Sequence, residues 1–307
     1  MNQSHFCEVQ AKPISCAIYG MGKAGRSLFL SLQKYGIAVT CFFARHPQKL
    51  QDFAKNFPVD LIPVHSKFPA FSESLQKTKT QILFLAVPDD AIEEVAHSLR
   101  YQDFLPPLIV HLSGALSYDV LSPISKRSSP AQFHPLASLS GQHQIPPGTL
   151  NAICTPDPKA EQILFQLSRQ IKLTPSFVKN GMQPFYHVAA SITGNLPIAL
   201  LSDSIYLMQQ AGIDANLARK GLAKLLRSTA KTIERKQLAN ALTGPIARGD
   251  VGTVKQHLFT LKKLNNKNQI ESVYRLLSNQ LIHFNDNAEK RIQFQELLAA
   301  EIPKKNP

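Results

Sequence analysis

The sequence predicts an α/β protein in which a parallel sheet domain is followed by an all-helical domain. Three observations support this expectation. An apolar segment at residues 14–19 runs into a glycine-rich turn, short apolar segments alternate with amphipathic ones up to residue 179, and strand-like patterns give way to helical periodicity after residue 181. We therefore predict a sheet domain over residues 1–179 and a helical domain over residues 180–307.

The glycine-rich turn is the most informative local motif. Ile14, Ala17 and Ile18 suit a strand buried on both faces, and the glycines that follow have the G-x-G-x-x-G spacing. In that motif one glycine permits the turn, one lets the backbone approach a pyrophosphate, and one lets the next helix pack on the sheet. The alternative is a tight turn with no ligand. We predict a Rossmann dinucleotide site formed by Gly20, Met21, Gly22, Lys23, Ala24 and Gly25.

The segment after the next expected strand, residues 37–43, selects the cofactor. Chains that bind NAD usually place Asp or Glu about twenty residues after the glycines, whereas this chain has Ala44, Arg45 and His46 there. An arginine beside a ribose phosphate makes charge-assisted hydrogen bonds worth about 1.5–3 kcal/mol. We therefore expect NADP as the cofactor, with Arg45 as a solvated loop charge as the alternative.

Composition is ordinary for a globular protein of this size. The 307 residues are 44% hydrophobic and 18% charged, residues 1–13 lack the apolar run of a secretory signal, and we expect no membrane-spanning stretch. The four cysteines, at 7, 16, 41 and 154, lack metal-ligand spacing and are interpreted as small buried residues. We predict a cytoplasmic protein without a metal site.

Positive charge is concentrated in the last third of the chain. Residues 217–307 hold 17 Lys or Arg against 7 Asp or Glu, so +10 of the net +13 lies there. Basic residues spaced by three and four form one helix face, which is typical of a solvated surface and lacks the interleaved aromatic residues of nucleic-acid sites. We expect no nucleic-acid partner. The basic residues are Lys220, Lys224, Arg227, Lys231 and Arg235.

The remaining elements follow from their apolar patterns. The clearest buried strand, residues 81–87, ends at Val87 and is followed by Pro88. Both residues should lie next to the nicotinamide, because loops after parallel strands cover the cofactor. The other strands are expected at 61–64, 108–112, 131–133, 151–155 and 175–178, and the helices at 47–56, 91–99 and 159–171. In the second domain we expect helices at 184–210, kinked by Gly194 and Pro197, and at 254–261, 270–284 and 288–300.

Four segments carry a family resemblance. They are His-Leu-Ser-Gly-Ala-Leu at 111–116, Phe-His-Pro-Leu at 133–136, Tyr-His-Val-Ala-Ala at 186–190 and Thr-Gly-Pro-Ile-Ala-Arg-Gly-Asp at 243–250. The chain resembles a Rossmann-like family whose C-terminal domain is of unknown function. That family is related to pyrroline-5-carboxylate reductase and to 6-phosphogluconate dehydrogenase-like NADP oxidoreductases. The resemblance implies the two-domain fold and the cofactor, without a settled substrate.

The resemblance also indicates catalytic candidates. Related β-hydroxyacid dehydrogenases have a lysine and, four residues later, an asparagine facing the nicotinamide, and His187 and Ser191 stand at the corresponding places. Asn195 continues this spacing along one helix face, although an interior histidine is the competing interpretation of His187. His134 ends an expected strand and could bind or protonate substrate, or merely bond its own turn. Ser113 could donate to substrate or ribose, and Arg248 could pair with a substrate carboxylate or with a helix end.

These observations predict an NADP-dependent oxidoreductase acting on a small ketone, imine or hydroxy acid in a cleft between the domains. The alternative is a non-catalytic NADP(H)-binding sensor or scaffold, since histidine replaces the expected lysine. Helix 184–210 is apolar on more than one face, which predicts a homodimer formed through the C-terminal domain.

Overall fold

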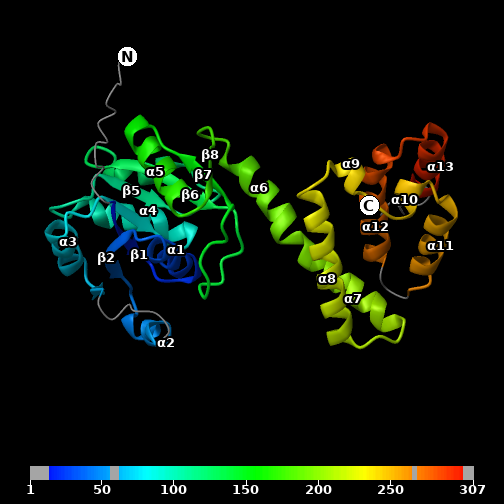
Figure 1. The fold of residues 1–307 in the computed structure, drawn as a ribbon, viewed down its shortest axis with the longest axis horizontal. Helices are drawn as coiled ribbons and strands as arrows, with labels where there is room; N and C mark the ends of the chain where they lie inside the picture. Colours follow the sequence, from blue (N-terminus) through cyan, green and yellow to red (C-terminus); the bar gives the residue numbers. More distant parts are fainter. Residues whose placement is uncertain (1–13, 56–61, 265–267, 300–307) are drawn as a thin grey trace, which may run out of the picture. The chain divides into compact units, whose positions relative to one another are not determined.

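The computed structural model describes residues 14–55, 62–264 and 268–299 and contains two compact units, one ending at Leu196 and the other beginning at Pro197 (Figure 1). The last strand ends at Phe177, close to the predicted boundary between residues 179 and 180. Helix α6, Gln183–Gly194, groups with the sheet unit by its contacts. The extents of the two domains stay a prediction.

The first unit is built on one eight-stranded sheet with the order β3-β2-β1-β4-β5-β6-β7-β8. All neighbouring strands pair in parallel except β6 and β7, which are antiparallel. The strand order reverses beside β1, and ligands of such sheets bind at the carboxyl ends of the strands at that point. The strands are β1 Ser15–Tyr19, β2 Ala38–Phe43, β3 Val64–His65, β4 Ile82–Leu85, β5 Leu108–His111, β6 Ser129–Pro135, β7 Leu150–Cys154 and β8 Thr174–Phe177.

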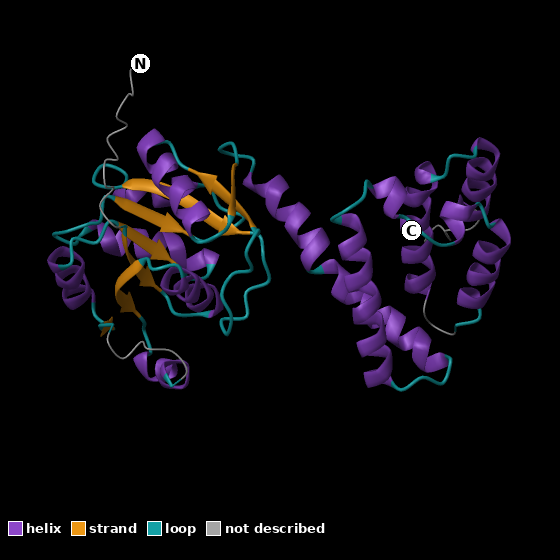
Figure 2. Ribbon diagram, in the orientation of Figure 1, coloured by secondary structure: helices purple, strands orange, loops and turns teal. Residues whose placement is uncertain are grey.

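Helices cover both faces of the sheet, which explains why its central strands are apolar throughout (Figure 2). Alternate residues of β1 enter opposite cores, with Cys16 and Ile18 in one and Ala17 and Tyr19 in the other. The first core includes side chains of α1 Lys23–Lys34 and α5 Pro158–Gln170. The second includes side chains of α3 Phe68–Lys77, α4 Asp89–Arg100 and the 3₁₀ segment η2 Tyr118–Ile124.

The sequence located these strands to within a few residues but did not assign α3 or η2. The predicted helix 47–56 is a 3₁₀ turn, η1 Pro47–Leu50, followed by α2 Gln51–Ala54, and its last residue lies outside the described part of the chain. Cys16, Cys41 and Cys154 are buried and free, as expected, whereas Cys7 lies outside the described residues. The predicted α/β class is confirmed.

The second unit contains helices and no strand among its described residues. A small core joins α10, α11, α13 and η3 through Ile246, Val254, Leu258, Ile282, Phe294 and Leu298. Buried Arg275 pairs with Glu271 at 2.7 Å and donates to the carbonyl oxygen of Leu297 at 3.0 Å, which fastens α12 to α13. The elements are α7 Leu196–Gln210, α8 Ala215–Ile233, α9 Leu238–Ala241, α10 Pro245–Arg248, α11 Val251–Lys262, α12 Asn268–Leu281, η3 Ile282–Phe284 and α13 Ala288–Ala299.

The predicted interruption of helix 184–210 is present, because α6 ends at Gly194 and α7 begins at Leu196. Together Gln183–Gln210 are long and apolar enough to cross a membrane by length and composition, with none of that window buried. This segment is the exception to the expectation that no stretch approaches membrane-spanning length. One such segment is weak evidence of a membrane span, because only its length and composition indicate one.

Candidate functional site

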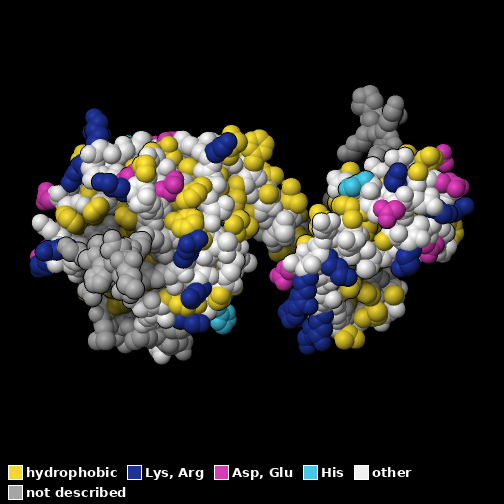
Figure 3. Space-filling view, turned by 45° about the horizontal axis from the view of Figure 1, so that its top comes forward, with side chains coloured by type: hydrophobic (Ala, Val, Ile, Leu, Met, Phe, Trp, Pro, Cys, Tyr) yellow, Lys and Arg dark blue, Asp and Glu magenta, His cyan; other side chains and the backbone are white. Residues whose placement is uncertain are grey.

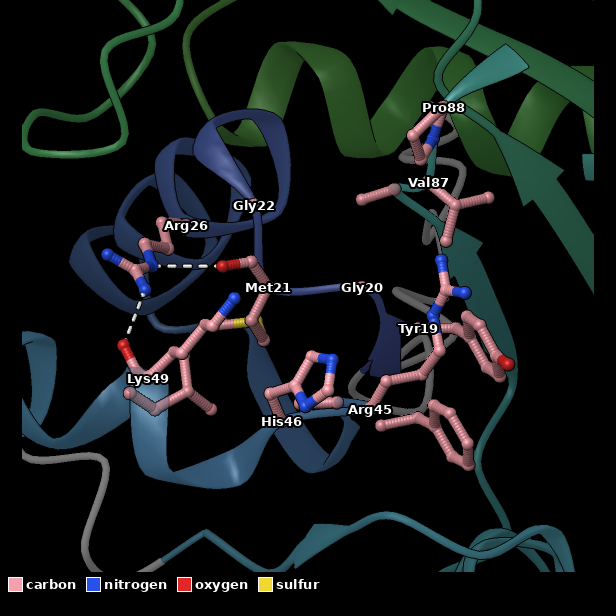
Figure 4. A pocket seen from close by; sticks show the side chains of 14 residues that line it. Tyr19, Gly20, Met21, Gly22, Arg26, Arg45, His46, Lys49, Val87 and Pro88 are labelled. Atoms are coloured by element: carbon pink, nitrogen blue, oxygen red, sulfur yellow. Dashed lines mark hydrogen bonds between the residues drawn. The ribbon is translucent and has the colours of Figure 1, made fainter. Parts of the chain in front are cut away.

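A pocket of about 330 Å³ lies where the carboxyl ends of β1, β2 and β4 meet (Figure 4). Its wall combines the glycine turn after β1 with the loops after β2 and β4. Among the described residues that line it, none is acidic. They are Tyr19, Gly20, Met21, Gly22, Arg26, Phe43, Ala44, Arg45, His46, Lys49, Leu50, Ala86, Val87 and Pro88.

The three glycines of the turn differ in what surrounds them. Gly20 has φ +100°, and a Cβ there would lie 2.5 Å from the carbonyl oxygen of Ala86. A Cβ on Gly25 would lie 2.0 Å from the carbonyl oxygen of Gly20, so α1 can pack this closely only with glycine. Gly22 has no atom within 4 Å of a built Cβ. The protein therefore fills the space beside Gly20 and Gly25 and leaves the space beside Gly22 open.

The open space lies at the start of α1. Gly22 is the N-cap of this helix and offers no side chain to its first N–H groups, and the first turn contains no acidic residue. Lys23 and Ala24 begin the helix. Unsatisfied N–H groups and the helix dipole favour an anion at this position. The turn therefore fits the pyrophosphate of a dinucleotide.

Basic side chains surround the end of β2. Arg45, His46 and Lys49 line the pocket, while Arg26 donates hydrogen bonds to the carbonyl oxygens of Met21 at 2.9 Å and Lys49 at 3.0 Å. Arg26 thus fixes the glycine turn to η1, as the dashed lines in Figure 4 show. Arginine and lysine recognise phosphate groups by charge-assisted hydrogen bonds. This edge of the pocket therefore suits a phosphate group.

Tyr19, the last residue of β1, also lines the pocket. Its ring stacks on Phe43 with centroids 4.1 Å apart, and burial raises the pKa of its hydroxyl to about 12, against a smaller lowering by Arg45. The hydroxyl is therefore neutral at neutral pH, and Tyr19 adds no negative charge beside the basic residues.

A second polar group of side chains lies at the carboxyl ends of β5 and β6. The Nδ1 atom of His134 lies 2.8 Å from the hydroxyl oxygen of Tyr186, which comes from α6. The imidazole packs against Gly114, where a Cβ would lie 2.9 Å from its Cε1 atom. Burial, and to a lesser extent His187, lower the pKa of His134 to about 4, with Asp89 opposing this shift. His134 is therefore neutral at neutral pH.

Ser113 organises the loop between β5 and η2. Its hydroxyl donates to Asp89 Oδ2 at 2.8 Å and accepts from the N–H groups of Ala115 and Leu116, both at 3.1 Å. The one hydroxyl proton and both lone pairs are thus engaged within the protein. Ser113 fastens its loop to the start of α4, and its predicted direct contact with the cofactor stays a prediction.

His111 supports the same loop from the interior. Its Nδ1 atom accepts from the N–H group of Ser113 at 3.2 Å, which leaves Nε2 to donate to the carbonyl oxygen of Ser117 at 3.2 Å. Burial lowers its pKa to about 4, against weaker effects of Ser117 and Asp89 in the opposite direction. This histidine is a buried, neutral positioning group.

Two glutamines connect this loop to α6. Gln132 donates to the carbonyl oxygen of Ser113 at 2.9 Å and accepts from the Nε2 atom of Gln183 at 3.4 Å. Both side chains are almost fully buried. Because Gln183 is the first residue of α6, these bonds set where that helix begins.

The structure brings only part of the predicted catalytic set together. His187 is exposed and near enough to His134 to lower its pKa, whereas Ser191 is half-buried and Asn195 is exposed further along α6. Within the described residues no hydrogen bond joins Ser191 or Asn195 to His134. Of the predicted cofactor residues, Gly20, Met21, Gly22, Arg45, Val87 and Pro88 line the pocket, Lys23, Ala24 and Gly25 lie in the first turn of α1, and Ser113 lies outside the pocket lining.

Sequence reasoning did not single out Tyr186, Lys49 or Asp89. Tyr186 stands in the Tyr-His-Val-Ala-Ala segment, directly before His187, and its spacing of three from Gln183 puts both on one side of α6. Lys49 lies four residues after Arg45, in η1 after β2. These sequence positions are the features from which Tyr186 and Lys49 could have been predicted as site residues.

Two family models match the chain. Residues 15–111 match the family described as NADP oxidoreductase coenzyme F420-dependent, and residues 150–281 match the family described as a domain of unknown function, DUF2520. The second match begins at β7, within the sheet unit. No curated protein matches the chain.

Solved structures share this fold at low sequence identity. A proposed NADP oxidoreductase from Bacteroides fragilis is 17% identical with a TM-score of 0.66, covering 88% of this chain and 98% of its own. A protein from Thermotoga maritima is 21% identical with a TM-score of 0.65, covering 92% and 98%. The pyrroline carboxylate reductase of Plasmodium falciparum, solved with NADP bound, is 12% identical with a TM-score of 0.57, covering 93% and 98%.

These matches confirm the resemblance inferred from the sequence motifs. The dinucleotide turn lies in the first matched region, and most of the helical unit lies in the second. Residues 15–111 thus resemble the NADP oxidoreductase family, and residues 150–281 resemble the DUF2520 family.

Proposed function

We propose that this protein is an NADP-dependent oxidoreductase acting on a small ketone, imine or hydroxy acid. The observation that carries the proposal is the pocket, in which an open glycine turn faces a basic loop and no carboxylate is present among the described lining residues. An NAD site would place an acidic side chain on the ribose at that loop. The NADP oxidoreductase family match over residues 15–111 supports the same reaction class.

Each part of the pocket has a task in this proposal. The N–H groups at the start of α1 bind the pyrophosphate, while Arg45 and Lys49 bind the 2′-phosphate. Val87 and Pro88 lie beside the nicotinamide half. When bound, the dinucleotide supplies or accepts a hydride. The polar groups at the ends of β5 and β6 hold the substrate and handle its proton, with His134 at the centre and His187, Ser191 and Asn195 along α6.

The cofactor assignment is tested by titrating NADPH and NADH into wild-type protein and into Arg45→Ala, following nucleotide fluorescence. Loss of the arginine should weaken NADPH binding by about 10- to 150-fold and NADH binding little, since a charge-assisted hydrogen bond contributes about 1.5–3 kcal/mol. Exposed Arg100→Ala, on α4 and outside the pocket lining, is the matched control. Equal weakening of both nucleotides in Arg45→Ala would contradict the assignment.

The alternative is an NADP(H)-binding sensor or scaffold that transfers no hydride. NADPH oxidation against a panel of keto acids and cyclic imines separates the two, with His134→Ala and His187→Ala as comparisons. Turnover by wild type above that of the variants supports the reductase. Tight NADPH binding with no turnover supports the sensor. The position of the substrate between the two domains stays a prediction.

We also propose a homodimer formed through apolar helix surfaces. Within α7 no residue is buried, and in α8 only Ala218 is. Exposed apolar surface of this extent is rare on monomers and favours a second copy of the chain. The most exposed apolar side chains on α6–α8 include Val188, Ile192, Ile198, Leu217 and Leu225, each at least 55% exposed.

The basic face of α8 needs no ligand in this proposal. Its lysines and arginines are exposed, and Figure 3 shows Lys and Arg side chains gathered on one face of the helical unit. Long basic side chains commonly cover a solvated helix face. We therefore propose neither a nucleic-acid nor a membrane partner. A cytoplasmic location accords with the three buried free thiols.

A further inference from the structure

The pairing of Tyr186 with His134 goes beyond the residues that the sequence motifs suggested. The two rings come from α6 and β6, lie 5.5 Å apart between centroids and are nearly perpendicular at 88°. The hydroxyl oxygen of Tyr186 is 2.8 Å from Nδ1 of His134 and 3.4 Å from the backbone oxygen of the same residue. The phenol is therefore held at one edge of the imidazole.

Both partners are positioned by other groups. The ring of His134 rests against Gly114, and its backbone pairs with Ala152 of β7. Tyr186 follows Gln183 by one turn of α6, and Gln183 bonds to Gln132 of β6. A fixed ring and a fixed helix start leave the hydroxyl little freedom, which is the preorganisation that a proton-transfer group needs.

A short series of contacts connects this pair with the dinucleotide pocket. Pro88 lines the pocket, and the next residue, Asp89, accepts the hydroxyl proton of Ser113 at 2.8 Å. Gly114 follows Ser113 and touches the ring of His134. Because β4, β5 and β6 run parallel, all these groups lie at the same edge of the sheet. The pair is thus one loop away from the nicotinamide end of the pocket.

The protonation states suit a donor of protons. Burial raises the pKa of Tyr186 to about 12, so its hydroxyl keeps its proton at neutral pH. His134 is neutral there, because its pKa is lowered to about 4. The facing charged or titratable groups are His187 on α6, Asp89 on α4 and His111 on β5. A neutral imidazole protonated on Nδ1 donates to the phenol oxygen, and the phenol O–H group then donates to the backbone oxygen of His134 at 3.4 Å, a long bond from which it can turn to a substrate.

We propose that Tyr186 is the proton donor to substrate and that His134 is its positioning residue. This inference rests on the proposed oxidoreductase function. Reduction of a ketone or imine adds a hydride to carbon, which the reduced nicotinamide supplies when bound, and a proton to oxygen or nitrogen. The O–H bond of Tyr186 breaks as the new O–H or N–H bond forms. The phenolate accepts the Nδ1–H hydrogen bond of His134 and regains a proton from water.

The test compares Tyr186→Phe with wild type in two measurements. The first is NADPH-dependent reduction of a panel of keto acids and cyclic imines, alongside NADPH affinity by fluorescence. Removing a general acid typically costs about 10²–10⁴-fold in rate, so kcat should fall by that factor with unchanged NADPH affinity. Tyr101→Phe, whose side chain is 77% exposed at the end of α4, should retain wild-type turnover.

The second measurement uses the protein without substrate. The ring-nitrogen NMR signals of His134, assigned by comparison with His134→Asn, should shift in Tyr186→Phe because the hydrogen bond to Nδ1 is lost. The same asparagine variant, whose amide replaces Nδ1, should retain more turnover than His134→Gln, whose amide replaces Nε2. Unchanged His134 signals in Tyr186→Phe would overturn the pairing.

The outcomes separate this inference from the function on which it rests. If Tyr186→Phe turns over substrate as fast as wild type, Tyr186 is not the proton donor, but the proposed oxidoreductase function is still supported. NADPH binding by wild type without turnover of any panel member would overturn both. Loss of kcat in Tyr186→Phe, together with the NMR shift and intact NADPH affinity, supports the assignment.

Discussion

Replacing Gly22 by alanine should weaken dinucleotide binding without disturbing the fold. The backbone here has φ −73° and ψ −164°, which any residue adopts, and the new methyl group would meet no atom within 4 Å. Alanine at such a position stabilises a protein by about 0.4–1 kcal/mol, because it restricts the unfolded chain. The methyl group would instead occupy the space that a pyrophosphate needs.

The expected loss follows from the hydrogen bonds displaced. If the methyl group moves the pyrophosphate away from one N–H group of α1, the cost is that of a hydrogen bond to a charged group, about 1.5–3 kcal/mol, or about 10- to 150-fold in Kd. NADPH and NADH should both be affected. Fluorescence titration measures the affinities, and thermal unfolding checks that the variant is no less stable.

Two matched glycine variants complete this experiment. Gly25→Ala should destabilise the protein, since its methyl group would lie 2.0 Å from the carbonyl oxygen of Gly20. Gly221→Ala, in the middle of α8 with no neighbour within 4 Å, should raise stability by about 1 kcal/mol and leave NADPH affinity unchanged. Wild-type NADPH affinity in Gly22→Ala would refute the glycine-turn assignment.

The remaining predictions concern assembly and acid stability. Sedimentation at micromolar concentration should give about twice the chain mass, and a wild-type monomer would contradict the dimer. Leu200→Glu should yield monomer or aggregate. Ile163→Glu on α5 should not, although Ile163 is 38% exposed and Leu200 is 39% exposed. Stability in urea should fall as pH drops from 6.5 towards 4, because unfolded histidine binds a proton in that range while folded His111, with its pKa of about 4, does not. His111 should account for a loss of at most about 3 kcal/mol in the free energy of unfolding. An unfolding free energy that does not change between pH 7 and 4.5, or that changes equally in His111→Asn, would contradict this prediction.

The sheet could be predicted because its strands are buried on both faces. Ile82, Leu83, Phe84 and Leu85 are all at most 1% exposed, and such a short uninterrupted apolar run is typical of a central strand in a parallel sheet. Helix α3 was missed although Phe71, Ser72 and Leu75 form its buried face, because a serine on that face and several flanking polar residues obscure the helical period. Burial on both sides is thus easier to recognise than a narrow apolar face.

The dinucleotide pocket was largely predictable and the polar cluster was not. Most residues of the pocket lie at or shortly after the ends of β1, β2 and β4, so the predicted strand ends located most of them. The partner of His134 lies 52 residues away on α6, and only the packing of that helix start against β6 brings it near. Likewise the hydroxyl of Ser113 donates to Asp89, and the hydrogen bonds of its own loop set this orientation. Contacts of this kind depend on tertiary structure.

In the most specific motif, at residues 243–250, most residues have a structural role in the fold. Gly244 and Gly249 have φ of +97° and +72°, Ile246 is buried in the core of the helical unit, and Asp250 caps α11 by accepting from the N–H group of Thr253 at 3.0 Å. Pro245 occupies the first turn of α10, where its missing N–H costs nothing. These roles explain the turn without any ligand.

Arg248 is the charged residue of that motif for which the fold shows no such task. Its side chain is exposed and makes no hydrogen bond with the described residues, so the alternative of a bond to a helix end is not seen there, and pairing with a substrate carboxylate stays a prediction. A motif dominated by glycine, proline and capping residues identifies a backbone conformation, and many chemistries can share one conformation. The reaction must therefore be inferred from the pocket and from the Tyr186–His134 pair, even though their sequence signals are less distinctive.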